Sequence, residues 1–142
     1  MTYCVGLKLR KGLVFMSDTR TNAGVDNIST FRKMFTWVDD GETYITLMTA
    51  GNLATTQSVV SLIDERNKAP SERQPAILSL PSMYQVARHV GQLLKEVIAQ
   101  HAEAGERAES YFNATVILGG QVKGSEPRLF LIYPEGNFIE AS

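Results

Sequence analysis

Residues 2–20 read TYCVGLKLRKGLVFMSDTR, and this stretch decides the fold. Residues 2–9 and 13–18 are rich in side chains that favour strands. The Arg10-Lys11-Gly12 segment between them is typical of a turn. We therefore predict an antiparallel hairpin. Both of its faces are largely apolar, which favours a sheet that is covered on both sides.

The hairpin is expected to gather polar side chains at its open end. If Leu9 lies opposite Leu13, side chains alternate along each strand so that one face carries four residues of interest. These residues are Thr2, Cys4, Asp18 and Arg20, with Thr2 across from Arg20 and Cys4 across from Asp18. Thr2 and Asp18 are then diagonal neighbours, within reach of a short polar contact.

A second hairpin is predicted from residues 33–38 and 43–50. The Asp40-Gly41 pair between them is a strong signal for a tight turn. With the turn centred on this pair, Lys33 lies across from Met48, near the end of the returning strand.

The hydrophobic period changes at Gly51 from that of a strand to that of a helix. We predict one helix over residues 52–67, capped by Asn52, and a longer one over residues 81–104, ended by Gly105. The remaining predicted segments are loops at 19–30 and 68–80, strands at 112–118 and 129–133, and a strand that begins at 137. Strands, two long helices and further strands predict an α+β layered sandwich.

Composition restricts the class of protein. The chain has 142 residues, 44% of them hydrophobic and 20% charged, which suits one globular domain. A formal net charge of −1 gives no reason to expect a nucleic-acid or membrane partner. No apolar run approaches the roughly 18 residues that span a bilayer, and we find no secretory signal. The single cysteine, Cys4, excludes an internal disulfide and fits a reducing compartment, so we expect a cytoplasmic protein.

Four residues could carry chemistry. Once Met1 is removed, Thr2 offers a hydroxyl and an α-amine whose unperturbed pKa is about 8, so the amine can activate the hydroxyl. Lys33 would add positive charge beside it, and Asp18 would hold that lysine. Gly51 lies at a strand-to-helix junction, where backbone N–H groups can stabilise an oxyanion.

Each of these residues also has an ordinary structural interpretation. A threonine after methionine is common, an aspartate often ends a strand, and a lysine that opens a strand is usually solvated. His89 and His101 lie twelve positions apart on one predicted helix, which is not the spacing of a metal-ligand pair. Gly119-Gly120 is more typical of a hairpin turn than of a phosphate loop, because no helix follows it. We expect no metal and no cofactor.

The same residues resemble the opening of proteasome β-type subunits. The shared features are an N-terminal threonine, a glycine turn, the Asp-x-Arg motif at 18–20, Ala23-Gly24, Arg32-Lys33, Thr49-Ala50-Gly51, Ile117-Leu-Gly-Gly120 and the LFLIYPEG segment at 129–136. The chain is most similar to the bacterial branch called Anbu, the ancestral β-subunit. That similarity rests on TNAGVD at 21–26, STFRKM at 29–34 and AGNLATTQ at 50–57.

This resemblance implies the four-layer α/β/β/α sandwich of N-terminal nucleophile hydrolases, with two antiparallel sheets between helical layers. It implies amide hydrolysis through a threonyl ester, with Thr2 as nucleophile, Lys33 and Asp18 tuning it, and Gly51 as oxyanion donor. Thr21, Phe31, Thr49 and Leu53 would line the substrate pocket. Family members extend well beyond this length, so residues 1–142 are expected to be one domain truncated at its C-terminus.

Two functions follow from the resemblance. The first is a threonine peptidase or amidohydrolase that acts on peptide or protein substrates as a homo-oligomeric ring or spiral. The second is a scaffold or binding module that keeps the fold without catalysis. A subunit of the bacterial protease that pairs with a ring unfoldase is disfavoured, because that family begins with two threonines and here Tyr3 follows Thr2. The substrate, the number of subunits and any ATP-dependent partner are left open.

Overall fold

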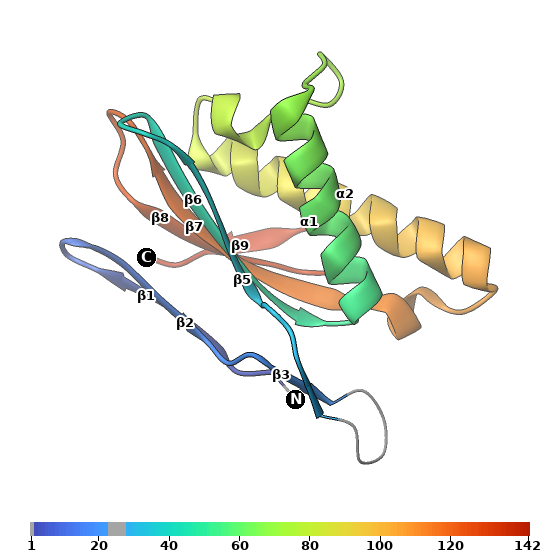
Figure 1. The fold of residues 1–142 in the computed structure, drawn as a ribbon. Helices are drawn as coiled ribbons and strands as arrows, with labels where there is room; N and C mark the ends of the chain where they lie inside the picture. Colours follow the sequence, from blue (N-terminus) through green and yellow to red (C-terminus); the bar gives the residue numbers. More distant parts are fainter. Residues whose placement is uncertain (1, 23–27) are drawn as a thin grey trace.

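The chain folds around one antiparallel sheet with helices on one face and a hairpin on the other (Figure 1). The computed structural model describes residues 2–22 and 28–142, and only the backbone of residues 20–22 and 28–30. The sheet has the order β5 (Met34–Asp39), β6 (Thr43–Gly51), β7 (Ala114–Val122), β8 (Arg128–Ile132) and β9 (Phe138–Glu140). The predicted α+β class, with antiparallel sheets and two long helices, is confirmed.

The first hairpin forms as predicted, but its register differs by one residue. β1 (Cys4–Leu9) pairs with β2 (Gly12–Ser17), so that Leu9 lies opposite Gly12. The turn therefore contains two residues rather than three. Cys4 lies opposite Ser17 and not opposite Asp18, and the predicted pairing of Thr2 with Arg20 is wrong for the same reason. A slip of one residue reverses the faces of one strand relative to the other. The observed register places Asp18 across from Tyr3, so it no longer groups Asp18 with Thr2 and Cys4 on one face as predicted.

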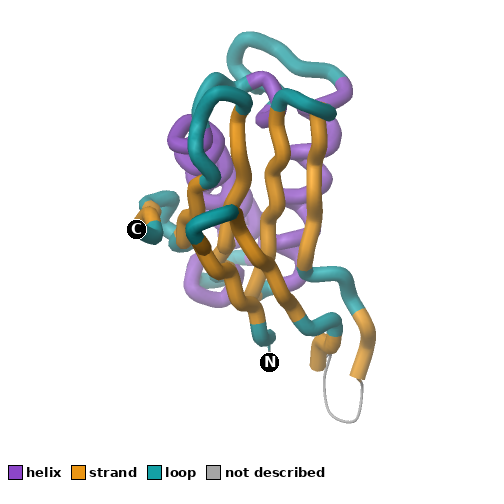
Figure 2. The backbone as a smooth tube through the Cα atoms, turned by 90° about the vertical axis from the view of Figure 1, so that its left-hand side faces the viewer, coloured by secondary structure: helices purple, strands orange, loops and turns teal. Residues whose placement is uncertain are grey.

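The inner face of this hairpin packs on the five-stranded sheet, on the side away from the helices (Figure 2). Gly6 permits a close approach, because a Cβ atom there would lie 3.1 Å from Ile117 Cγ2 and 3.2 Å from Leu129 Cδ1. The ring of Phe15 lies directly over Gly119. The outer face is not covered by the described residues. Its exposed apolar side chains are Tyr3, Leu7, Leu9, Val14 and Met16.

The second hairpin is also shifted by one residue from its prediction. Asp39 pairs with Thr43 across a three-residue turn, in which Gly41 adopts a φ of +77°. Asp-Gly predicts a two-residue turn, but a left-handed glycine also suits a three-residue one. The backbone of Lys33 consequently lies opposite Thr49, not Met48, and the Thr49 N–H donates to the Lys33 carbonyl at 3.0 Å.

The predicted loop at 19–30 contains two short strands. β3 (Arg20–Asn22) pairs with β4 (Ile28–Thr30) in a sheet of their own. The polar composition of this stretch concealed them. Phe31 N–H donates to the Thr19 carbonyl at 2.7 Å. This hydrogen bond joins the two ends of the β3–β4 segment directly before the second hairpin.

Helix α1 (Leu53–Lys68) begins at the predicted cap Asn52, and α2 (Met83–Gly105) begins after Ser82, close to its predicted start at 81. The side chains of Asn52 and Ser82 accept hydrogen bonds from the N–H groups of Thr55 and Gln85. At the end of α2 the left-handed residue is Glu106, with a φ of +53°, rather than Gly105. Short 3-10 turns η1 (Ile77–Ser79) and η2 (Glu109–Phe112) flank α2, so the strand predicted from 112 begins two residues later.

The main hydrophobic core lies between the two helices and the sheet. Both helices turn an apolar stripe toward β6, β7 and β8, as amphipathic surface helices do. Fully buried core residues include Ile45, Leu47, Val59, Ile63, Val86, Val90, Leu94, Val116, Leu118, Phe130 and Ile132. Packing against this core holds the C-terminal end of β6, which contains Thr49 and Gly51. None of the helices described for this chain is long and apolar enough to cross a membrane.

Candidate active site

An ion pair between Asp18 and Lys33 is the centre of the candidate site. Lys33 Nζ donates to Asp18 Oδ1 at 2.6 Å, and the two side chains are 6% and 37% exposed. The predicted contact is present, and the alternative of a solvated Lys33 is wrong. The hydrogen bond from Lys33 is the main cause that lowers the pKa of Asp18 below its usual value of 3.8, and a backbone hydrogen bond of Tyr3 adds to it.

The N-terminal segment runs beside this ion pair. Asp18 N–H donates to the Tyr3 carbonyl at 3.0 Å, which places Asp18 across from the residue that follows Thr2. Thr2 itself is half-buried. A buried ammonium group such as that of Lys33 favours the deprotonated forms of the groups near it.

Cys4 connects the first strand to the end of β6. Its Sγ lies 3.7 Å from the Thr49 carbonyl, to which the thiol donates. Burial is the main cause that raises the pKa of the Cys4 thiol above its usual 9.0; the charge of Asp18 raises it further and that of Lys33 opposes the rise. Cys4 therefore remains a neutral thiol at neutral pH, which fits the prediction of a small side chain directed into the sheet.

Gly51 ends β6 at the predicted junction with α1. Its φ is +119°, and a Cβ atom there would lie 2.6 Å from the Asn113 carbonyl, so glycine is required. Backbone N–H groups alternate in direction along an antiparallel strand. Since Thr49 N–H points to Lys33 and Asn52 N–H points to Asn113, Gly51 N–H points to the edge of β6 that holds Lys33.

The four predicted pocket residues are distributed over β3, the segment before β5, the end of β6 and the first turn of α1. Thr49 is buried within β6, and Leu53 is half-buried in the first turn of α1. Phe31 lines a recess of about 410 Å³ between the start of β5 and α1. Thr21 belongs to β3 by its backbone, and its side chain lies outside the described residues. Residues 23–27, which include the Ala23-Gly24 pair of the family resemblance, also lie outside the described residues.

The recess beside Phe31 includes residues that were not predicted from the sequence. They are Arg32, Phe35, Gln57, Val60 and Ser61. The Arg32 guanidinium lies 5.0 Å from the centre of the Phe35 ring, and its Nε donates to the Met34 carbonyl at 2.9 Å. Helical spacing could have found Gln57, because it lies four residues after Leu53 and therefore on the same face of α1.

The remaining candidates have structural roles in the part of the chain that is described. His101 Nε2 lies 3.4 Å from Ser58 Oγ, and its ring packs edge-on against Phe112. Gly119 and Gly120 belong to β7, not to a turn as predicted, because the strand continues to Val122. Among the described residues, no group of three or more His, Cys, Asp or Glu side chains could hold a metal ion.

Comparison with known proteins identifies relatives among solved structures. No family profile and no curated protein matches the sequence. Anbu from Yersinia bercovieri is 47% identical with a TM-score of 0.89 over 98% of this chain and 56% of that one. A Gly-1 mutant of Anbu from Hyphomicrobium sp. strain MC1 is 48% identical with a TM-score of 0.85 over 100% and 56%. The helical assembly of the Anbu complex from Pseudomonas aeruginosa gives 42% and 0.87 over 98% and 56%.

These identities extend over essentially all of the present chain, and they agree with the residues that resembled the Anbu branch. The chain spans about half the length of the solved proteins that it matches, 56% in each of these three. The chain is therefore Anbu-like and belongs with the proteasome-related proteins.

Proposed function

We propose that this chain carries the nucleophile of a bacterial threonine peptidase or amidohydrolase, with Thr2 exposed as the N-terminal residue by removal of Met1. The observation that carries this proposal is the buried ammonium group of Lys33, held 2.6 Å from Asp18 beside the N-terminal segment. A buried charge is costly to maintain even when it is paired. If Lys33 had only a structural role, an apolar side chain could fill the same buried space without the cost of burying a charge.

The reaction proceeds through an ester. The α-amine of Thr2 takes the hydroxyl proton while Oγ1 attacks the carbonyl carbon of the scissile amide. Collapse of the tetrahedral intermediate breaks the C–N bond, and the ammonium returns the proton to the leaving amine. The amine then takes a proton from water, the resulting hydroxide attacks the ester, and Oγ1 is released and reprotonated. Lys33 favours the neutral amine by its charge, and Asp18 holds Lys33 in place.

Gly51 N–H is the proposed donor to the oxyanion. It points to the edge of β6 that holds Lys33, and Gly51 lies two residues before the start of α1. A fixed backbone dipole stabilises the developing charge without reorganisation during the reaction. Thr49 and Leu53 are proposed to border the substrate, and the recess beside Phe31 and Gln57 would receive one of its side chains.

The architecture and assembly of the whole protein are also proposals. We infer a four-layer sandwich of one domain, in which a second helical layer and further strands cover the exposed apolar face of the first hairpin. We infer that the protein acts in the cytoplasm as a homo-oligomer, a ring or a spiral. The helical assembly of the Pseudomonas aeruginosa Anbu complex supports this inference.

Hydrolysis of short peptide amides by the purified full-length protein tests this function. Mass spectrometry first establishes that Met1 is absent. Thr2→Ser keeps a hydroxyl and an amine and should retain measurable hydrolysis, whereas Thr2→Val keeps the shape without the hydroxyl and should abolish it. Hydrolysis by Thr2→Val at the wild-type rate would overturn the proposal.

A further inference from the structure

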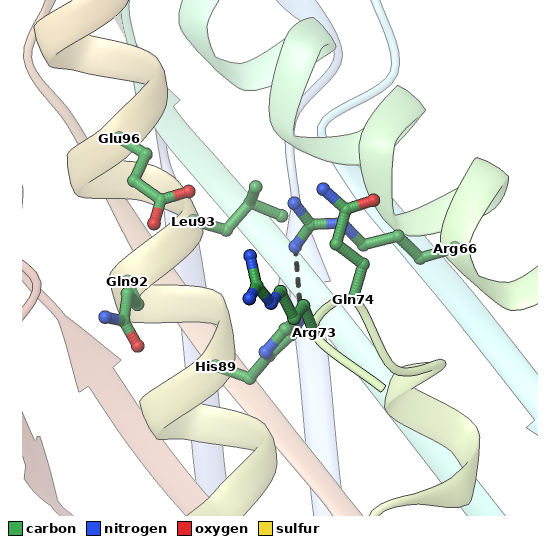
Figure 3. A pocket seen from close by; sticks show the side chains of 7 residues that line it. All are labelled: Arg66, Arg73, Gln74, His89, Gln92, Leu93 and Glu96. Carbon is green, nitrogen blue, oxygen red and sulfur yellow. Dashed lines mark hydrogen bonds between the residues drawn. The ribbon is translucent and has the colours of Figure 1, made fainter. Parts of the chain in front are cut away.

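A separate cavity of about 230 Å³ lies between α1, α2 and the loop that joins them (Figure 3). It belongs to the helical layer, whereas the Asp18–Lys33 pair borders the hairpin on the other side of the sheet. α1 contributes Arg66, the loop contributes Arg73, and α2 contributes His89, Gln92 and Glu96. His89, Gln92 and Glu96 share one face of α2 because they follow helical spacing.

His89 fixes the position of one of the two guanidinium groups. Arg66 Nη1 lies 3.2 Å from His89 Nε2. A guanidinium can only donate hydrogen bonds, so Nε2 is the acceptor and the proton of the neutral ring is on Nδ1. Burial, followed by the charge of Arg66, lowers the pKa of His89 below its usual 6.5, while Glu96 opposes this shift. A neutral His89 can therefore hold Arg66 without adding charge to the cavity.

The cavity contains more positive than negative charge. Arg66 and Arg73 both reach into it from different segments, as Figure 3 shows. Among the described residues, no carboxylate lies within 4.0 Å of either guanidinium. Glu96 is the acidic side chain that lines the cavity, and it lies along α2 beyond Gln92. Buried Leu93 contributes an apolar surface to the lining, and the amides of Gln74 and Gln92 add hydrogen-bonding groups.

We propose that this cavity binds a small oxyanion, a phosphate or carboxylate group, between Arg66 and Arg73. Guanidinium groups recognise such anions through paired hydrogen bonds, and His89 presents one of them in a fixed orientation. The cavity volume is several times the roughly 30 Å³ that one water molecule occupies in the liquid. The site therefore has room for an anionic group that is part of a small organic molecule. This inference is independent of the hydrolase function.

Titration of the full-length protein with sodium phosphate and with sodium acetate tests the proposal. Calorimetry measures binding, NMR of the His89 ring reports its location, and the ionic strength is held at about 0.15 M to screen diffuse attraction. At least one of the two anions should bind saturably, once per chain, and shift the His89 signals; which anion binds tells the phosphate source from the carboxylate source. The absence of saturable binding for both anions would overturn the proposal.

Substitutions separate a defined site from general surface charge. Arg66→Gln and Arg73→Gln should each weaken binding about tenfold, as expected for loss of a charge-assisted hydrogen bond. Arg88→Gln is the matched control, because Arg88 is an exposed neighbour of His89 on α2 that does not line the cavity. It should leave affinity within about twofold. Equal loss in Arg88→Gln would contradict the site, and exposed Arg73 decides the question if Arg66→Gln does not fold.

Discussion

Lys33 Nζ lies 2.6 Å from Asp18 Oδ1, although the two residues come from different hairpins and are fifteen positions apart in the chain. The lysine is buried and the aspartate is partly exposed, so solvent reaches the pair from the side of Asp18. Tyr3 and Cys4 lie next to this ion pair, because the Tyr3 carbonyl accepts a hydrogen bond from the Asp18 N–H and the Cys4 thiol donates to the carbonyl of Thr49, which pairs with the Lys33 backbone.

Removing the charge of Lys33 should reduce hydrolysis without preventing folding. Lys33→Met keeps most of the apolar length of the side chain, and kcat should fall about 100-fold or more while KM changes little. Steady-state kinetics on a peptide amide measures both constants. Lys123→Met is the control, since Lys123 is exposed and pairs with Glu42 at 3.4 Å in the turn region of the sheet. A Lys33→Met enzyme with wild-type kcat would contradict the role given to Lys33.

The Asp18–Lys33 pair should stabilise the fold only while Asp18 is ionised. The folded-state pKa of Asp18 is lowered, so the unfolded chain binds its proton first as the pH falls. The stability that the pair contributes is complete above the unfolded value of 3.8 and is lost as the pH falls from there through the folded pKa. Urea unfolding of the wild type and Asp18→Asn should therefore differ by a constant amount at neutral pH. The difference should shrink below pH 3.8, and a difference that stays constant down to pH 2 would count against the ion pair.

Gly51→Ala should destabilise the protein more than an alanine at an open left-handed position. The new Cβ would lie 2.6 Å from the Asn113 carbonyl and 2.7 Å from Ala114 Cα, at a φ of +119°. We expect a loss of about 2 kcal/mol or more in the free energy of unfolding. Gly124→Ala has a φ of +84° and open space around it, so it should cost only about 1 kcal/mol. Equal losses in denaturant unfolding would show that close packing at Gly51 is unimportant.

The recess beside α1 should influence which substrates are cleaved. Gln57→Trp would fill part of the 410 Å³ space next to Phe31. For substrates with a large side chain before the scissile bond, kcat/KM should fall about tenfold relative to substrates with a small one. Gln85→Trp, at an exposed position of α2 outside the recess, should leave this ratio unchanged. An unchanged ratio in Gln57→Trp would place the specificity pocket elsewhere.

The sequence predicted the helices well because their signals are local. Asn52 and Ser82 each have a side chain suited to an N-cap, and the apolar stripe of α2 follows directly from its period. Both hairpin registers were predicted with an error of one residue. The predicted registers depended only on the assumed turn lengths. Apolar residues on both faces of the first hairpin gave no pattern that distinguishes one register from the next.

The contact between Asp18 and Lys33 could be predicted in spite of these errors, since both residues lie at strand ends where the chain is less constrained by the ladder. The recess around Gln57 could not be predicted in full, because it forms where β5 and α1 meet and these elements are distant in the chain. The position of Gly51 was predicted, but its positive φ and its contact with Asn113 depend on the pairing of β6 with β7.

Covalent labelling at residue 2 tests the central claim most directly. The full-length protein, with Met1 shown by mass to be absent, is incubated with an epoxyketone, whose two electrophilic carbons can react with the hydroxyl and the amine of one N-terminal threonine. We predict one adduct per active chain, mapped to Thr2 by peptide sequencing and abolished in Thr2→Ala. A properly assembled oligomer with a free Thr2 and no adduct would contradict the hydrolase and favour a scaffold that keeps the fold without catalysis.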